Sequence, residues 1–418
     1  MNFDIFEANE SEVRSYCRKF PTVFSKAKNA IITDTNGKEY IDFFAGAGAI
    51  NFGHNNKYIK DAILDYLSED SIIHALDMYT KAKEAFIDTL NKEILRPRNL
   101  NYKIMCCGST GTNAVEAALK LCRKVKKRDN VFAFSGAFHG MSLGALSMTG
   151  DRFSRTGAGV SLGNVSFMPY FNSFNDPDIS LDYFENVLND DHSGIDKPAA
   201  VFLETVQAEG GINVAPINWL KRLRQICDDN DILMVVDDIQ VGVGRTGTFF
   251  SFERADIKPD MVILSKSISG FGLPMSIMLM KPEYDVFKPA EHNGTFRGNQ
   301  LAFVGSRAGM EYFNKFDLAG KVKENEKYIS EYLSQNIAAI DERLKIRGIG
   351  MIWGVDFVSI DPKLALEASH RCFDKGLVIE LAGRNDSVLK ILPPLTIEKE
   401  HLNKGLEIIT QEVKQLLR

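Results

Sequence analysis

Lys266 and Asp237 each stand at the C-terminal end of a strongly apolar segment. Lys266 follows Met261-Val-Ile-Leu-Ser, and Asp237 follows Ile232-Leu-Met-Val-Val. Burying an unpaired charge costs several kcal/mol, so a charge in such a place needs a partner or a function. A desolvated lysine has a lowered pKa and attacks carbonyl carbons. A strand-end lysine whose ammonium reaches solvent is the ordinary alternative. We predict instead an active site that contains Lys266 as a nucleophile together with Asp237.

Two further segments have the composition of a ligand site. Gly108-Ser-Thr-Gly-Thr-Asn-Ala114 lies between a predicted strand and a predicted helix, where free N–H groups and the helix dipole favour a phosphate. An ordinary capped turn explains that motif equally well. Phe138-His-Gly140 offers an aromatic ring that could stack on a planar ligand, or else a core phenylalanine beside a satisfied histidine.

A glycine motif raises an alternative from another enzyme class. Gly242, Gly244 and Gly247 match the GxGxxG pattern of NAD(P) oxidoreductases. Two carboxylates, Asp237 and Asp238, come just before these glycines and would repel a pyrophosphate. The residues that follow also do not resemble the start of a closely packed helix, so we disfavour this alternative.

The elements that must position these residues alternate along the chain. We predict strands at 102–106, 131–134, 199–205, 232–238 and 261–267, with helices such as 112–127 and 219–228 between some of them. This alternation predicts an α/β fold with a mostly parallel sheet. Right-handed crossovers place the strand ends on one edge, so Glu204, Asp237 and Lys266 should converge there.

The two ends of the chain follow a different pattern. Residues 30–44 read as a hairpin with a turn at Asn36-Gly37. A long helix at 318–336 and short strands near 351–357 and 388–392 indicate a smaller α+β domain. We therefore expect an N-terminal segment, 1–55, that packs with the small domain, a large domain at 56–305 and the small domain at 306–418.

Composition excludes several classes of function. The 418 residues carry a net charge of -5, with 44 % hydrophobic and 25 % charged residues, so we expect neither nucleic acid nor a membrane as partner. No apolar run is long enough to span a membrane, and the N-terminus does not resemble a secretion signal. The six cysteines show no CxxC spacing and the seven histidines no metal-ligand spacing. We expect a cytoplasmic protein with no bound metal.

Several motifs, in this order along the chain, resemble the class III (ω-amino acid) pyridoxal phosphate aminotransferases. They are Gly-Ser-Thr-Gly-Thr-Asn-Ala-Val-Glu-Ala-Ala, Phe-His-Gly, Leu-Glu-Thr-Val-Gln-Ala-Glu-Gly-Gly, Asp-Asp-Ile-Gln-Val-Gly-Val-Gly-Arg-Thr-Gly, the strand-end Ser-Lys and Gly-Thr-Phe-Arg-Gly-Asn-Gln. The resemblance covers almost the whole chain. It implies a fold-type I pyridoxal phosphate transferase, with a seven-stranded, mostly parallel sheet in the large domain and a smaller α+β domain.

The resemblance also implies roles for single residues. Lys266 would bind the cofactor covalently and move protons, and Asp237 would keep the ring nitrogen protonated. The remaining cofactor contacts would come from Gly111, Thr112, Phe138, His139, Gln240 and, from a second subunit, Thr295. A homodimer or a higher homo-oligomer is therefore expected.

Residues 14–21 and 43–56 most resemble one branch of this family. That branch moves an amino group between L-glutamate and L-aspartate 4-semialdehyde, giving 2-oxoglutarate and L-2,4-diaminobutyrate for ectoine or siderophore synthesis. Ornithine, acetylornithine or 4-aminobutyrate are the alternative substrates on the same scaffold. A catalytically silent relative is a further alternative, which the intact Lys266 and Asp237 disfavour.

Two departures from the family pattern bear on the substrate. Met141 stands where many relatives carry an arginine after Phe-His-Gly, and Lys390 stands where they carry an arginine before Pro-Pro. Lysine lacks the bidentate fork of arginine, so it should grip a carboxylate differently. Our hypothesis is that Lys390 pairs with Glu204 while the diamino substrate is bound and turns to the carboxylate of glutamate in the other half-reaction.

Overall fold

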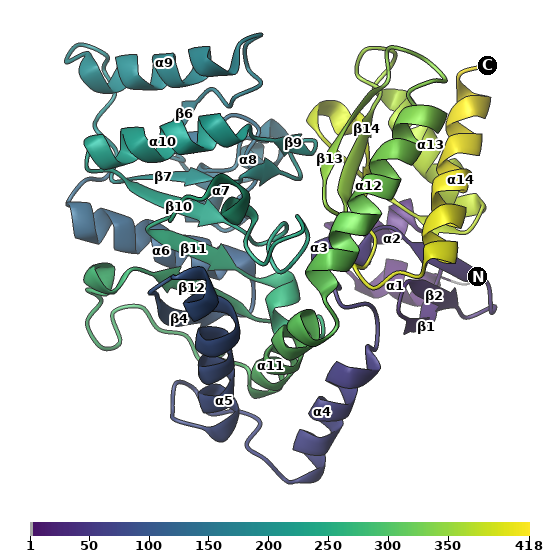
Figure 1. The fold of residues 1–418 in the computed structure, drawn as a ribbon, viewed down its shortest axis with the longest axis horizontal. Coiled ribbons are helices and arrows are strands. Elements are labelled where there is room, and N and C mark those ends of the chain that lie inside the picture. The colour runs from purple at the N-terminus through teal and green to yellow at the C-terminus, as the bar shows by residue number, and fades with distance from the viewer. Residues whose placement is uncertain (1–2) are drawn as a thin grey trace.

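A seven-stranded sheet forms the centre of the computed structural model, which describes residues 3–418 (Figure 1). Its strands lie in the order β4 (Lys103–Gly108), β12 (Ser276–Met280), β11 (Met261–Leu264), β10 (Leu233–Asp237), β7 (Ala200–Leu203), β5 (Val131–Phe134) and β6 (Val165–Met168). All neighbours are parallel except β12, which is antiparallel to both β4 and β11. The predicted α/β class and its mostly parallel sheet are confirmed.

Both faces of this sheet are covered by helices. Successive side chains of a strand point to opposite faces, and in β10 they join two separate cores. Met234 and Val236 pack into the larger core with helix α10 (Ile217–Asp229), whereas Leu233 and Val235 pack into the smaller core with helix α6 (Gly111–Lys126). Continuous apolar runs are typical of such doubly covered parallel strands.

Helix α11 (Gln300–Lys315) extends the large domain beyond its main sheet. It packs against α4 (Lys57–Ser68) and α5 (Lys81–Thr89), which lie together at the foot of the molecule (Figure 1). The expected boundary between residues 305 and 306 falls inside this helix. The division into domains stays a prediction, and the packing of α11 favours a boundary after residue 315.

A second sheet lies on the other side of the molecule, close to both termini (Figure 1). Its strands are β13 (Lys345–Ile349), β14 (Ile352–Asp356), β17 (Val388–Ile391) and β16 (Glu380–Ala382), in that order. Helices α12 (Leu318–Asn336), α13 (Lys363–Asp374) and α14 (Lys399–Leu416) accompany them. Every neighbouring pair in this sheet is antiparallel.

The N-terminal hairpin joins this region through backbone pairing. Strands β1 (Phe24–Lys28), β2 (Ile31–Asp34) and β3 (Glu39–Asp42) form an antiparallel meander. Strand β15 (Leu377–Val378), which directly follows α13, pairs in parallel with β3 and completes the sheet. Residues more than three hundred positions apart in the chain are therefore hydrogen-bonded to each other.

The structure differs from the sequence prediction mainly at β11 and β12. We expected a strand over 261–267, but β11 ends at Leu264 and Lys266 begins a 3₁₀ helix, η4 (Lys266–Ser269). The antiparallel β12 and strand β6 were not predicted. No helix among the described residues is both long enough and apolar enough to cross a membrane.

Candidate active site

A cavity of about 150 Å³ lies at the C-terminal edge of the main sheet. It collects most of the predicted site residues, namely Gly111, Thr112, Phe138, His139, Glu204, Asp237, Gln240 and Lys266. Ile239 and Glu209 also line it and were not predicted. The convergence of Glu204, Asp237 and Lys266 is thus observed, while the role of each residue stays a prediction.

Lys266 reaches the cavity from the first residue of η4. Its backbone adopts a left-handed conformation, with φ +52°. Its ammonium donates a 2.8 Å hydrogen bond to the carbonyl of Ala47, from the N-terminal segment. Ser267 Oγ donates to the Gly48 carbonyl at 2.7 Å, so the two segments hold each other. Burial lowers the pKa of Lys266, as a lysine nucleophile requires.

Asp237 and His139 form a buried pair on one side of the cavity. His139 Nδ1 lies 2.8 Å from Asp237 Oδ2, and the backbone N–H of Ile239 donates to Asp237 Oδ1 at 3.1 Å. Burial lowers the pKa of His139, but the hydrogen bond and the charge of Asp237 outweigh it and raise that pKa overall. The carboxylate is thereby held in one orientation.

The N-terminus of α6 closes another side of the cavity. Thr110, just before the helix, donates its N–H to Asn113 Oδ1 at 3.1 Å. A Cβ at Gly111 would lie 2.7 Å from Cδ1 of Ile239, so a larger residue there would have to displace that side chain. Thr112 Oγ1 is 2.6 Å from Ser142 Oγ. The positive end of the helix dipole and glycine-lined backbone suit a phosphate group.

Gln240 lines the cavity next to Glu209. Its Nε2 donates to Ala47 O at 2.8 Å and to Glu209 Oε1 at 3.0 Å. Its Oε1 is buried and has no hydrogen-bond partner within residues 3–418. A buried polar atom without a partner costs free energy, so this oxygen is available to a ligand.

The expected pairing of Lys390 with Glu204 is wrong. Lys390 Nζ instead lies 2.5 Å from Glu209 Oε1 and 2.9 Å from Glu380 Oε2. Glu204 Oε1 accepts the N–H of Phe138 at 2.9 Å, and burial raises the pKa of this carboxyl to about 7. Glu204 directly follows strand β7, whereas Glu209 lies past the short strand β8 (Val206–Gln207). In the motif Glu-Thr-Val-Gln-Ala-Glu, the partner of Lys390 is therefore the second glutamate, Glu209, and not the first.

A second, wider cavity of about 550 Å³ adjoins the first, since Phe138 and Glu209 line both. Arg152 and Arg384 are among its other lining residues. The site therefore has an inner part at Lys266 and an outer part that is large enough for a small amino acid. Lys390 is fully buried behind Glu209.

Thr295 does not line either cavity of its own chain. It is exposed, and its carbonyl lies 3.1 Å from His74 Nε2. This position is compatible with a contact to the site of another subunit, which stays a prediction.

The GxGxxG segment performs a structural task. No helix begins there in the described chain, and the Arg245 side chain within the motif is fully buried. Arg245 donates to the carbonyls of Met351 and Pro393, at 2.9 and 2.5 Å, and to Asn51 Oδ1 at 2.5 Å. A Cβ at Gly244 would lie 2.7 Å from Phe313. The glycines thus allow close packing between distant parts of the chain.

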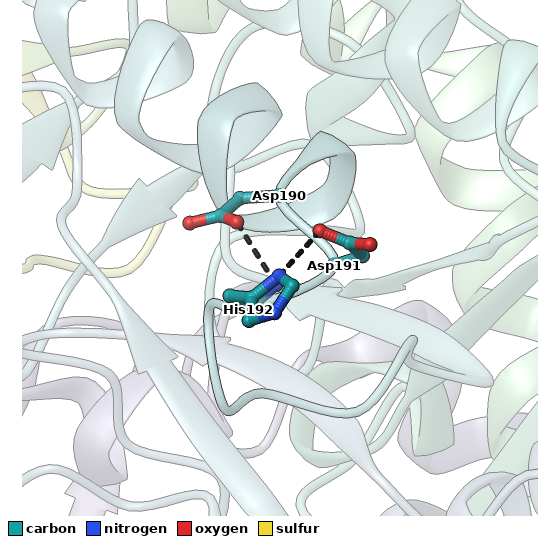
Figure 2. A group of neighbouring side chains, drawn as sticks. All are labelled: Asp190, Asp191 and His192. Atoms are coloured by element: carbon teal, nitrogen blue, oxygen red, sulfur yellow. Dashed lines mark hydrogen bonds and ion pairs between the residues drawn. The ribbon is translucent and has the colours of Figure 1, made fainter.

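One group in the described residues has the spacing of a metal site. Asp190, Asp191 and His192 lie close together just after helix α9 (Pro177–Asn189), as Figure 2 shows. All three are exposed, and none lines the two cavities described above. Exposed acidic groups of this kind need no metal, and we assign none to them.

Comparison with known proteins identifies the family. The model of the family described as aminotransferase class-III matches residues 14–413. The chain belongs to the class III aminotransferases. Curated relatives named diaminobutyrate–2-oxoglutarate transaminase include one from Bordetella parapertussis, 50 % identical over 100 % of this chain and 96 % of its own. Another, from Marinococcus halophilus, is 50 % identical over 99 % of this chain and 97 % of its own.

Solved structures agree on the fold of this aminotransferase. An ornithine aminotransferase from Toxoplasma gondii superposes with a TM-score of 0.85 at 24 % identity, covering 99 % of this chain and 94 % of its own. An S-selective transaminase from Bacillus megaterium has a TM-score of 0.87 at 20 % identity, covering 100 % and 98 %. The fold-type I architecture predicted from the sequence is confirmed.

Pyridoxal phosphate is the cofactor of class III aminotransferases, and the inner cavity fits it. Gly111 and Thr112 at the start of α6 would hold the phosphate, and Phe138, which lines the same cavity, would stack on the ring. Asp237 presents a fixed carboxylate, and Lys266 presents its ammonium. The unpartnered oxygen of Gln240 supplies a further contact.

Proposed function

We propose that this class III aminotransferase exchanges an amino group between L-glutamate and L-aspartate 4-semialdehyde, giving 2-oxoglutarate and L-2,4-diaminobutyrate. The observation that carries the proposal is Lys266, a partly buried lysine of lowered pKa in a cavity shared with Asp237. The name shared by relatives that are half identical over the whole chain supports the choice of substrates. Supply of a precursor for ectoine or siderophores belongs to the same proposal.

The residues around Lys266 would divide the chemistry between them. Bound pyridoxal phosphate supplies an electron sink for the carbon that loses its proton. Lys266 holds and moves that proton, because its amine is uncharged more readily than an exposed lysine. Asp237, fixed by His139, would keep the ring nitrogen protonated through a charge-assisted hydrogen bond.

Substrate recognition would involve Lys390 and Glu209. Burial opposes ionisation of both groups, but each stabilises the charge of the other, so the pKa of Lys390 is raised and that of Glu209 is lowered. With a diamino substrate bound, this ion pair remains closed. With glutamate bound, Glu209 moves aside and Lys390 binds the carboxylate next to the reacting amine.

We also propose that the working unit is at least a homodimer in the cytoplasm. The segment between α4 and α5 exposes Ile72, Ile73, Met78 and a fully exposed Tyr79, and Phe296 is exposed beside Thr295. A surface with so many large apolar side chains favours association. The six free cysteines support a reducing compartment.

The proposal is tested with the purified protein. We expect a yellow enzyme, and after borohydride treatment we expect the cofactor mass on the peptide that contains Lys266. A colourless protein that does not bind pyridoxal phosphate would contradict the central claim. Glutamate is then offered with aspartate 4-semialdehyde, N-acetylglutamate 5-semialdehyde, glutamate 5-semialdehyde or succinate semialdehyde. The first acceptor should give a kcat/KM at least about tenfold above the others.

A further inference from the structure

Lys390 has two carboxylate partners that differ in their freedom to move. Glu380 stands on β16 directly opposite Lys390 on β17, as a cross-strand pair. Its side chain is 5 % exposed, whereas that of Glu209 is 30 % exposed. Glu209 lies on a loop and borders both cavities. Glu209 therefore has space to move away from Lys390, whereas the side chain of Glu380 is enclosed beside it.

The position of the Lys390 ammonium depends on which partner it keeps after Glu209 leaves. A lysine side chain has four rotatable bonds and carries a point charge, without the planar fork by which arginine fixes itself. If Lys390 had Glu209 as its single partner, its buried charge would lose that partner whenever Glu209 moved. Glu380, whose Oε2 lies 2.9 Å from the ammonium, offers a second partner that does not depend on Glu209.

The charges of Lys390, Glu209 and Glu380 also favour the replacement of Glu209 by a substrate carboxylate. Two carboxylates face one ammonium, so Glu209, Glu380 and Lys390 together carry one net negative charge. When Glu209 leaves, the remaining pair of Lys390 and Glu380 is neutral. An entering substrate carboxylate then restores the arrangement of one ammonium between two carboxylates. The substrate thus takes the place of Glu209.

We propose that Glu380 is a positioning residue that holds Lys390 in its place behind Glu209 while a substrate carboxylate replaces Glu209. This inference rests on the proposed function and adds to it. Glu380 acts on the half-reaction of glutamate and 2-oxoglutarate. It has little effect on diaminobutyrate, for which Lys390 stays paired with Glu209.

The test compares wild-type holoenzyme with Glu380→Gln. Each half-reaction is followed separately by the visible spectrum, and binding of glutarate, a dicarboxylate without an amino group, is measured by calorimetry. We expect glutarate affinity and the apparent affinity for glutamate to fall about tenfold or more, because Glu209 would then be the single partner of a buried ammonium and its departure would leave that charge unpaired. The maximal rate with glutamate and the affinity for diaminobutyrate should each change less than about threefold.

Two further variants separate positioning from general damage. Asp386→Asn removes an exposed carboxylate from the same hairpin, at a left-handed position that asparagine tolerates. It should leave the affinities for glutarate, glutamate and diaminobutyrate and the maximal rate with glutamate unchanged. Glu380→Asp keeps the charge on a shorter side chain and should recover part of the lost affinity. If Glu380→Gln does not fold, the glutarate affinity of Glu380→Asp decides, and an affinity equal to that of wild type overturns the proposal.

Other outcomes are equally decisive. Unchanged glutarate affinity in Glu380→Gln, or an equal loss for glutamate and diaminobutyrate, overturns the positioning role. If the wild-type enzyme reacts with glutamate but not with diaminobutyrate, the proposed amino acceptor fails. The glutarate measurement still decides the role of Glu380 in that case, because it involves no amino acceptor.

Discussion

The imidazole of His139 lies 2.8 Å from the carboxylate of Asp237, and neither side chain exposes more than 4 % of its surface. The carboxylate of Asp237, which would face the cofactor ring, is therefore fixed by its contact with the imidazole of His139. Truncating one member of such a pair leaves the other buried without its partner. The pair thus links the stability of the protein to the chemistry of its active site.

Replacing His139 with phenylalanine should therefore weaken both properties. We expect the free energy of unfolding of the apoprotein to fall by about 3 kcal/mol, the usual cost of breaking a buried ion pair. Urea denaturation measures this change, and cofactor titration should show weaker binding. His370→Phe, at an exposed position of α13, is the matched control. Equal stability of the two variants would contradict the expectation.

Glu204 should make stability depend on pH. Burial raises the pKa of this carboxyl from 4.5 to about 7, so the folded state retains a proton that the unfolded chain releases. Its contribution to stability is therefore complete below about pH 4.5 and is lost as the pH rises through 7. We expect unfolding midpoints of wild type and Glu204→Gln to diverge over this range, with Gln more stable at pH 8 by up to about 3 kcal/mol. Parallel curves from pH 5 to pH 8 would count against the raised pKa.

Arg245 should be irreplaceable by lysine. Its guanidinium donates to two backbone carbonyls and to Asn51, and its side chain is fully buried. A lysine cannot reproduce this fork, so Arg245→Lys should lower the unfolding free energy by about 2–4 kcal/mol. Arg96→Lys, at an exposed position of the 3₁₀ helix η2 (Arg96–Arg98), should change it by less than about 0.5 kcal/mol. Thermal unfolding monitored by circular dichroism compares the two.

Met141 should restrict which substrates are accepted. Its side chain is 55 % exposed and lines neither cavity, and it directly follows the Phe-His-Gly motif, where the family resemblance leads us to expect an arginine. We expect Met141→Arg to raise kcat/KM for 4-aminobutyrate about tenfold or more, because a new cation would meet its carboxylate. Met141→Leu keeps the position apolar and should show no such gain. A similar gain in both variants would rule out carboxylate recognition as the cause.

Thr295 should act on another subunit's site. Chains with Lys266→Ala and chains with Thr295→Ala would each form defective homodimers. In a mixed dimer of the two, one site carries both changes and the other carries neither, provided that Thr295 acts across the interface. Unfolding and refolding an equal mixture should therefore restore part of the wild-type activity. No recovery would place Thr295 outside the partner's site.

The sequence predicted the main sheet well because its strands are unusually apolar. Each residue of β5, β7, β10 and β11 is buried, so continuous apolar runs with polar ends marked both the strands and the cavity. The motif order then supplied the cofactor. The antiparallel direction of β12 could not be predicted, because an apolar run has the same composition in either direction.

The partners of Lys390 could not be read from the sequence. Glu204 and Glu209 are five residues apart, and only the short strand β8 determines which of them faces the lysine. Glu380 becomes a neighbour through the pairing of β16 with β17. Register of this kind depends on the turn between the strands, where Asn385 and Asp386 adopt left-handed conformations. Local composition does not determine it.

The pairing of β3 with β15 has a consequence for the order in which the protein folds during its synthesis. The hairpin that contains β3 leaves the ribosome early, but its partner strand is made more than three hundred residues later. At about 5–20 residues per second this delay lasts some tens of seconds. Until then the backbone of β3 lacks one neighbour. The carbonyls of Ala47 and Gly48 likewise wait for Lys266 and Ser267, which are made 219 residues after them. The earliest part of the chain to be made is thus among the last to be fixed, and a chaperone that binds nascent chains would find its longest-lived target there.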